Sequence, residues 1–216
     1  MERFWPVPYL LDPTNLVIDA DVTFVVAALL AVMVQAEAQA FAATFLGDYR
    51  VGAKDRFHFN AFLHLDVWGG ICYLAGGFGW SKPVAVDASR FAHPYLYLVL
   101  TRLAGPVANL LLANIAASLV FLLGKVNIDA RVFAMVLGVN VTTAVYNLIP
   151  LPPLAAGSVL LGLIPARLAT LRWLIPQLGA FILVAWCLVE RLSPPGIIRP
   201  YIDELVRKVF AFIAGI

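Results

Sequence analysis

Long apolar runs dominate this chain of 216 residues and are separated by short polar segments. A helix needs roughly 20 predominantly apolar residues to cross about 30 Å of hydrocarbon. The runs of about this length are Val22–Leu46, Pro94–Leu123, Val132–Ile149 and Leu171–Leu192. They predict four membrane-spanning helices.

Two shorter segments give less regular signals. Asn60–Trp80 is long enough for a span but contains His64, Asp66 and several glycines. A clean span and a broken or re-entrant helix both fit it, and irregular backbone at membrane depth has to pack against protein or line a cavity. Ala155–Leu163 predicts a further short apolar helix.

The C-terminal segment Ile197–Ile216 carries apolar and charged residues at helical spacing. Apolar residues fall on one side, at Ile202, Leu205, Val209, Phe210 and Ile213, and charged residues on the other, at Asp203, Glu204, Arg207 and Lys208. This pattern predicts an amphipathic helix that lies on the membrane interface or docks against the bundle.

These elements predict an all-α integral membrane protein with about four to six transmembrane or re-entrant helices plus the amphipathic C-terminal helix. The prolines and glycines fall between helices rather than between domains, so a single membrane domain, 1–216, is expected. Within it we distinguish an N-terminal extension, 1–21, a core, 22–192, and the C-terminal helix, 197–216.

Composition supports this fold and narrows the partners. Hydrophobic residues make up 62% of the chain and charged residues 13%, a balance that a soluble domain could not bury in one core. The net charge is +2 and the basic residues are scattered, which excludes nucleic acid and leaves the lipid bilayer as a partner. Cys72 and Cys187 have no metal-type or disulfide-type spacing and are expected to be small buried hydrophobes.

Several short motifs follow one another in a specific order. The first is VQAEAQAFAATFLGDYR, whose polar residues interrupt an apolar run; then come NAFLHLD, GWSKPV, RLAGPVANLLLANI and YNLIPLPPLAAGSVL. In this order they resemble the site-2 protease family of zinc intramembrane metalloproteases, in its short bacterial branch. The resemblance extends from Gln35 to Leu192.

The resemblance also assigns the positions of the family's zinc site. That site uses H-E-x-x-H on one helix and a third ligand in L-D-G, because hydrolysis needs two imidazoles one turn apart, a further ligand and a carboxylate base. Here Gln35 and Gln39 stand at the two histidine positions, Ala36 at the glutamate position and Ala155 at the aspartate position of L-D-G. We therefore expect a catalytically inactive member of the family, with no metal, no other cofactor and no enzymatic activity.

Polar residues at membrane depth are the candidates for a cleft. Gln35, Gln39, Asn109 and Asn147 are expected to face one another if the family fold is kept, either as hydrogen bonds between helices or as the lining of a retained cavity. His64 and Asp66 are further cleft candidates, although a structural hydrogen-bond network is the favoured interpretation. Arg102 is expected to pair with an acidic residue.

Three functions from different classes remain open. The favoured one is an accessory subunit bound to other membrane protein subunits through the N-terminal aromatics, Phe4, Trp5 and Tyr9, and the C-terminal helix. The alternative is binding of transmembrane clients or a lipid in the former active-site cleft. The least favoured is an active metalloprotease with atypical ligands drawn from Glu37, His58, His64 and Asp66.

The short branch is bacterial, so the resemblance implies the inner (cytoplasmic) membrane. Gly47–Ser89 carries four Lys and Arg residues, whereas Gly124–Arg131 carries two. This difference places the first of these segments in the cytoplasm.

Overall fold

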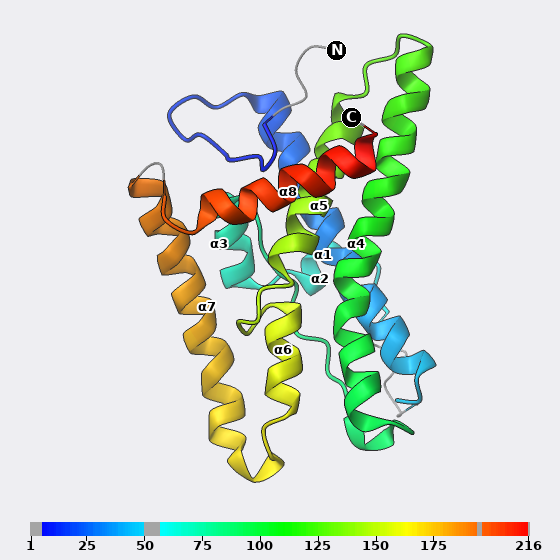
Figure 1. The fold of residues 1–216 in the computed structure, drawn as a ribbon, viewed down its shortest axis with the longest axis vertical. Helices are drawn as coiled ribbons and strands as arrows, with labels where there is room; N and C mark the ends of the chain where they lie inside the picture. Colours follow the sequence, from blue (N-terminus) through cyan, green and yellow to red (C-terminus); the bar gives the residue numbers. More distant parts are fainter. Residues whose placement is uncertain (1–5, 50–56, 194–195, 216) are drawn as a thin grey trace.

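The computed structural model describes residues 6–49, 57–193 and 196–215. In chain order the helices are α1 Ile18–Phe45, α2 Ala61–His64, α3 Val67–Gly76, η2 Ala88–Arg90, α4 Pro94–Lys125, α5 Arg131–Tyr146, α6 Ala155–Gly162, η3 Ala166–Leu168, α7 Ala169–Leu192 and α8 Arg199–Ala214 (Figure 1). The described chain is helices and connecting loops, with one isolated antiparallel bridge between Leu65 and Ser81. The predicted all-α fold is confirmed.

Three of these helices, α1, α4 and α7, are long and apolar enough to cross a membrane. They match three of the four predicted spans. The fourth predicted span, Val132–Ile149, corresponds to a shorter apolar helix. The corresponding helix, α5, has 16 residues and ends at Tyr146. Every residue from Ala134 to Tyr146 is buried. A helix that is hydrophobic on all sides can be a core helix as well as a span, and α5 packs against α1, α4 and α8 as the centre of the bundle.

The segment Asn60–Trp80 forms a broken helix and not a clean span. The side chain of Asn60 accepts a hydrogen bond from the backbone at the start of α2, and Asp66 does the same for α3. Gly77 ends α3 with a φ of 76°, in the left-handed region that glycine adopts without steric cost. The break between α2 and α3 is therefore explained by the residues that cap these helices.

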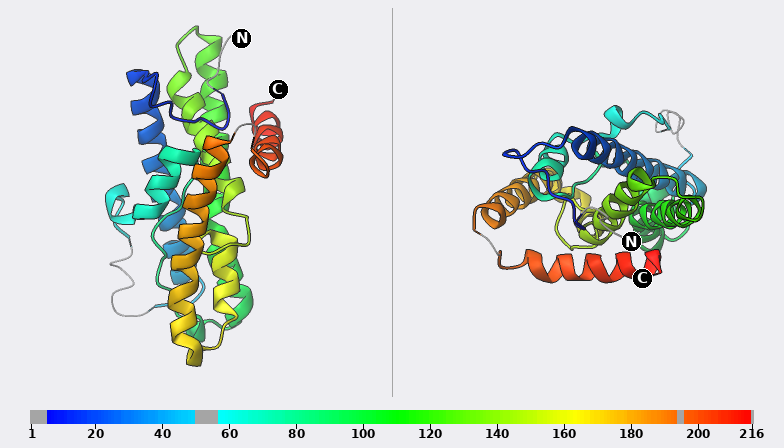
Figure 2. Two further views of the ribbon diagram at one scale, coloured as in Figure 1. Left: turned by 90° about the vertical axis from the view of Figure 1, so that its left-hand side faces the viewer. Right: turned by 90° about the horizontal axis from the view of Figure 1, so that it is seen from above.

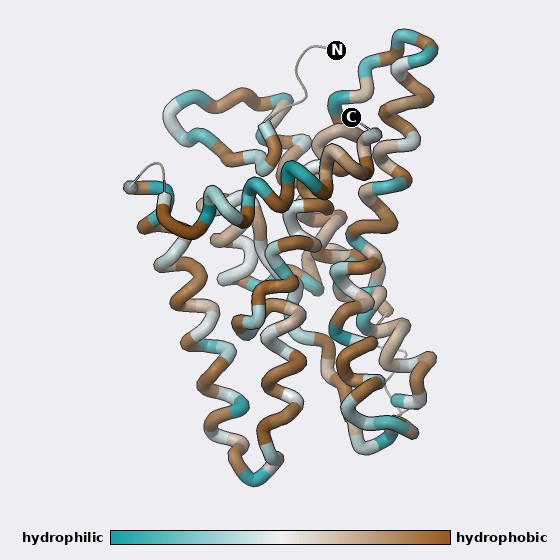
Figure 3. Tube along the Cα trace, viewed as in Figure 1, coloured by the Kyte–Doolittle hydropathy of each residue, from teal (hydrophilic) through white to brown (hydrophobic). Residues whose placement is uncertain are grey.

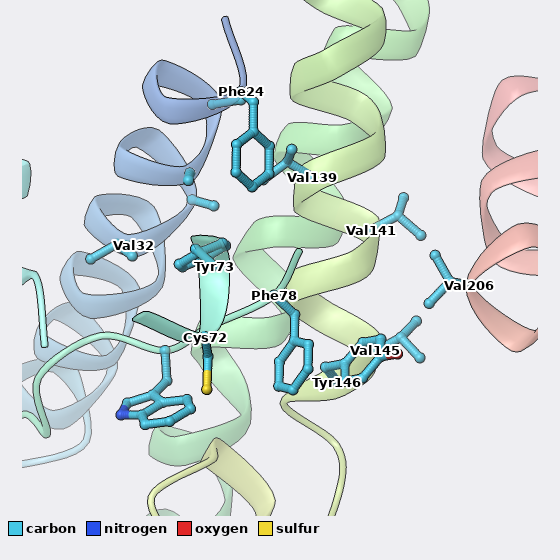
Figure 4. Packing of buried hydrophobic residues seen from close by; sticks show 14 of the residues in the cluster. Phe24, Val32, Cys72, Tyr73, Phe78, Val139, Val141, Val145, Tyr146 and Val206 are labelled. Atoms are coloured by element: carbon cyan, nitrogen blue, oxygen red, sulfur yellow. The ribbon is translucent and has the colours of Figure 1, made fainter. Parts of the chain in front are cut away.

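The C-terminal helix α8 lies crosswise to the long helices (Figures 1 and 2). Its buried residues are Val206 and Phe210, and Figure 4 shows Val206 beside Val141 and Val145 of α5. Polar and apolar residues alternate along it in Figure 3. The predicted amphipathic helix is present, and it is docked against the bundle.

Aromatic and sulfur contacts hold the broken segment to the bundle. The ring of Phe78 stacks on Tyr146 with centroids 3.9 Å apart, and α3 packs along α7. The thiols of Cys72 and Cys187 lie 3.9 Å apart, and both cysteines are buried and free. Residues far apart in the sequence thus meet in one apolar core around α5, part of which Figure 4 shows.

Candidate functional site

A cluster of buried amides lies where the resemblance places the family's metal site. The Gln35 amide on α1 donates to the Asn147 side-chain oxygen at 3.1 Å, and the Asn109 amide on α4 donates to the Gln35 oxygen at 3.4 Å. Gln35, Gln39, Asn109 and Asn147 are all buried. The structure thus brings together polar groups from α1, α4 and the end of α5.

Asn147 is the hub of this amide cluster. Its side-chain nitrogen donates to the carbonyl oxygens of Gly79 and Thr143, each at 2.9 Å. Its side-chain oxygen also accepts from the backbone N–H of Ala155 at 3.3 Å. The position that the resemblance gives to the third ligand, Ala155, therefore lies beside the same cluster. One side chain fixes the proline-rich corner between α5 and α6 against the turn that follows α3.

Arg102 adds a positive charge at the edge of the cluster. Its Nη1 donates to the Gln39 side-chain oxygen at 3.2 Å and to the Val84 carbonyl at 3.0 Å. Both partners are neutral, so the expected pairing of Arg102 with an acid is not found among the described residues. Within the described part of the chain its buried Nε has no hydrogen-bond partner.

Gly105 allows α1 and α4 to approach each other at this point. A Cβ atom at this position would lie 2.7 Å from Gln35 Cγ and 2.9 Å from Gln39 Nε2. Both distances are shorter than a van der Waals contact, so a larger residue would push the glutamines out of place. The small residues of the motif RLAGPVANLLLANI thus have a direct role in assembling the cluster.

The opposite face of α1 carries an acidic site. Oε1 of Glu37 accepts hydrogen bonds from the backbone N–H groups of His58 and Phe59 at 2.8 and 2.9 Å. It also lies 2.9 Å from Nε2 of His64, and both side chains are buried. Glu37 therefore holds the incoming segment, residues 57–64, against α1.

His64 and Asp66 do not face one another. His64 bonds to Glu37, whereas Asp66 accepts a hydrogen bond from Gly69 N at 2.9 Å as the cap of α3. Sequence reasoning missed the contact between Glu37 and His64. The available signal was that a buried carboxylate in an apolar helix requires a partner.

The Gly-Asp pair of the first motif anchors the loop at the other end of α1. Asp48 is buried and accepts a hydrogen bond from the backbone N–H of Asp87 at 3.0 Å. Hydrogen bonds from Ser89 hold the pKa of Asp87 below its usual value, because they favour the ionised carboxylate. Segment 83–89 is thereby fixed beside α4, next to Arg102.

The residues at the family's metal positions do not fit a zinc ion. Amide oxygens are poor zinc ligands, and the guanidinium of Arg102 beside them repels a cation. On the other face of α1, Glu37 and His64 form a hydrogen bond with each other, and the Asp66 carboxylate caps the start of α3. Across the residues that the structure describes, no three His, Cys, Asp or Glu side chains are placed to hold a metal ion.

Comparison with known proteins finds a similar protein in Bacillus subtilis (strain 168), named "Putative zinc metalloprotease YwhC". It is 33% identical to this chain over 174 residues, which cover 76% of this chain and 75% of that protein. No protein-family model matches the chain, and no solved structure matches it. The similarity corrects the expectation that the chain is not an enzyme, because the similar protein is named as a zinc metalloprotease and no observation shows this chain to be inactive.

Proposed function

The chain belongs to the family of zinc metalloproteases represented by its Bacillus subtilis relative, and from that premise we propose that it works as a subunit of a larger membrane complex. In this proposal, α4 binds a transmembrane helix of another subunit. The observation that carries the proposal is a polar group on the exposed side of α4, inside its most apolar stretch.

The exposed side of α4 has the spacing of a helix-packing surface. We call this surface the α4 seam, and its residues are Val107, Leu111, Asn114, Ser118 and Phe121, all exposed. They follow one another at intervals of four and three residues, which is the pattern of a helix-packing seam. Only 17% of the most apolar stretch of α4 is buried inside the protein. The seam is therefore available to a partner.

Asn114 places a carboxamide in the middle of the α4 seam. Its nitrogen donates to the Leu110 carbonyl at 2.9 Å, and Ser118 donates to the Asn114 carbonyl at 3.0 Å. Among the described residues, the Asn114 side-chain oxygen accepts no hydrogen bond. The surrounding run Val107–Leu123 contains no charged residue, so this oxygen faces hydrocarbon, where an unpaired polar group is costly.

A second helix that offers a hydrogen-bond donor would satisfy this oxygen. Polar side chains at helix interfaces in membranes contribute roughly 0.6–2 kcal/mol each. The partner we propose is therefore a transmembrane helix with Ser, Thr, Asn or Gln facing Asn114.

The sequence favoured the two chain termini as contact surfaces. Changes there test this proposal less well than changes in the α4 seam. Phe4 and Trp5 lie outside the described residues. Removing 197–216 would uncover the part of α5 that Val206 and Phe210 cover, so it would disturb the fold as well as any interface. A single change in the α4 seam separates the two effects.

The test is to purify the full chain from its native membrane in mild detergent and to measure the mass of the complex. The variant is Asn114→Leu, and the matched control is Ile182→Leu on an exposed face of α7. Wild type and control should retain a stoichiometric partner, and Asn114→Leu should weaken its binding about 3- to 30-fold, as expected for losing one interhelical hydrogen bond.

Three results would overturn the proposal. They are a lone monomer of wild type, a partner that stays fully bound to Asn114→Leu, and a complex that contains only further copies of this chain. The last result would place a self-interface on α4 instead of another subunit.

A further inference from the structure

A cavity of about 750 Å³ lies between α4, α6, α7 and the segment 83–89. Leu98 and Arg102 line it from α4, Leu161 from α6, and Arg172 and Trp173 from α7. Its volume is in the range of small-molecule sites, which is about 300–1,000 Å³. The cavity adjoins the amide cluster, because Arg102 contacts both.

Arg102 is the deepest charged group in the cavity wall. It lies eight residues after Pro94, about 12 Å along the helix from its start. Its partners are the neutral oxygens of Gln39 and Val84, and its buried Nε has no partner in the described structure. A guanidinium at this depth is normally stabilised by an anion or by water. The cavity is the side from which an anion can reach it.

The rest of the lining has a surplus of positive charge. The Arg172 guanidinium donates to the carbonyls of Ile164 at 2.8 Å and Gly162 at 3.5 Å, so its charge is not neutralised by these contacts. Asp87 also lines the cavity, but it forms an ion pair with Arg90 at 3.2 Å and accepts two hydrogen bonds from Ser89. Two arginines thus face the cavity against one carboxylate that already has partners.

The apolar part of the lining indicates which kind of anion fits. Leu98, Leu161 and Pro176 give hydrocarbon contacts, and Trp173, which is 67% exposed, sits at the rim. Tryptophan at a rim is typical of the membrane–water interface. Basic pockets between transmembrane helices commonly bind phosphate-bearing lipid head groups.

We propose that this cavity binds the phosphate head group of an anionic phospholipid, with Arg102 as the principal contact and Arg172 at the rim. The acyl chains would lie along the apolar wall. A soluble phosphate compound shares the charge but cannot use this wall, so the lipid is the ligand expected to bind. The proposal does not depend on a partner at the α4 seam.

The test uses the full chain in nanodiscs of phosphatidylcholine with or without phosphatidylglycerol. Native mass spectrometry counts the retained lipids, and thermal unfolding reports the stabilisation that each lipid gives. The variants are Arg102→Gln and Arg102→Lys, and the matched control is Arg131→Gln. Arg131 is exposed, pairs with Asp129 at 2.7 Å and does not line the cavity.

Wild type should retain phosphatidylglycerol in preference to phosphatidylcholine. Arg102→Gln should weaken this retention about tenfold or more, because it removes a charge-assisted hydrogen bond. Arg102→Lys should keep the preference in weaker form, and Arg131→Gln should leave it unchanged. Unfolding in phosphatidylcholine alone shows whether Arg102→Gln is folded. If it is not, Arg172→Gln replaces it, with an expected loss of about threefold for a group at the rim.

Equal retention of the two lipids by wild type would overturn the proposal, and so would unchanged retention by a folded Arg102→Gln. Glycerol 3-phosphate serves as the soluble competitor. If it stabilises the protein as much as phosphatidylglycerol does, the site is one for soluble phosphates and the assignment to a lipid is wrong.

Discussion

The two faces of α1 between Gln35 and Gln39 carry opposite kinds of polar chemistry. On one face, Gln35 and Gln39 contact the side-chain amides of Asn109 and Asn147 and the guanidinium of Arg102. On the other face, Glu37 meets His64 and two backbone N–H groups. The neutral residues face the centre of the bundle, and the acid faces the broken segment 57–66.

This difference follows from what each face can satisfy. The bundle centre offers side chains from α4 and α5, whose amides can pair without placing a negative charge in an apolar core. The broken segment offers free backbone N–H groups and a histidine, which together stabilise a carboxylate. The amide face therefore joins four parts of the fold, whereas the acidic face fixes one segment to one helix.

The largest effect is expected from removing the hub of the amide face. Asn147→Leu leaves the Gly79 carbonyl, the Ala155 N–H and the Gln35 amide without their partner. Each unsatisfied buried group costs roughly 1–3 kcal/mol, so the free energy of unfolding should fall by about 4 kcal/mol. Reversible unfolding in mild detergent measures this loss.

Asn114→Leu is the matched control for this prediction, because it makes the same chemical change at an exposed asparagine of α4. In the isolated chain it should alter the unfolding free energy by less than about 0.5 kcal/mol. Equal effects of the two substitutions would show that Asn147 does not join the bundle in the way described.

A smaller and more local effect is expected on the acidic face. Glu37→Gln keeps the shape of the side chain but removes its charge, so the hydrogen bonds to His58, Phe59 and His64 become neutral ones. The difference between charged and neutral hydrogen bonds is about 1 kcal/mol. Hydrogen exchange should speed up at the His58 and Phe59 amides and stay unchanged in α5. Faster exchange in α5, or none at His58 and Phe59, would contradict the separation of the two faces.

The sequence predicted the parts of the fold that depend on long apolar runs. It placed α1, α4 and α7 correctly, and the pattern of Ile197–Ile216 located α8. It placed an apolar helix at α5 but could not show that this helix is buried on all sides, because the same apolar composition suits a lipid-facing span and a core helix. Burial against neighbouring helices cannot be read from hydropathy.

The candidate site shows a similar division. The resemblance placed Gln35, Asn109 and Asn147 in related positions, and the structure brings them into contact. The partners of Arg102 and the contact between Glu37 and His64 were missed. Both depend on where the segments 57–66 and 83–89 return against the bundle, which no local periodicity encodes. Whether these residues act as a functional site stays a prediction.

At the family's metal positions this chain carries Gln35, Ala36, Gln39 and Ala155, and with the guanidinium of Arg102 beside Gln39 this set does not fit zinc. The zinc content of the purified full chain after a wash with a weak chelator tests this most directly. A variant with Gln35→His, Ala36→Glu, Gln39→His and Ala155→Asp, which carries the residues of the resembling family, is measured beside it. The wild-type chain should hold far less than one equivalent of zinc and the variant clearly more. One tightly held equivalent in the wild type would contradict the claim.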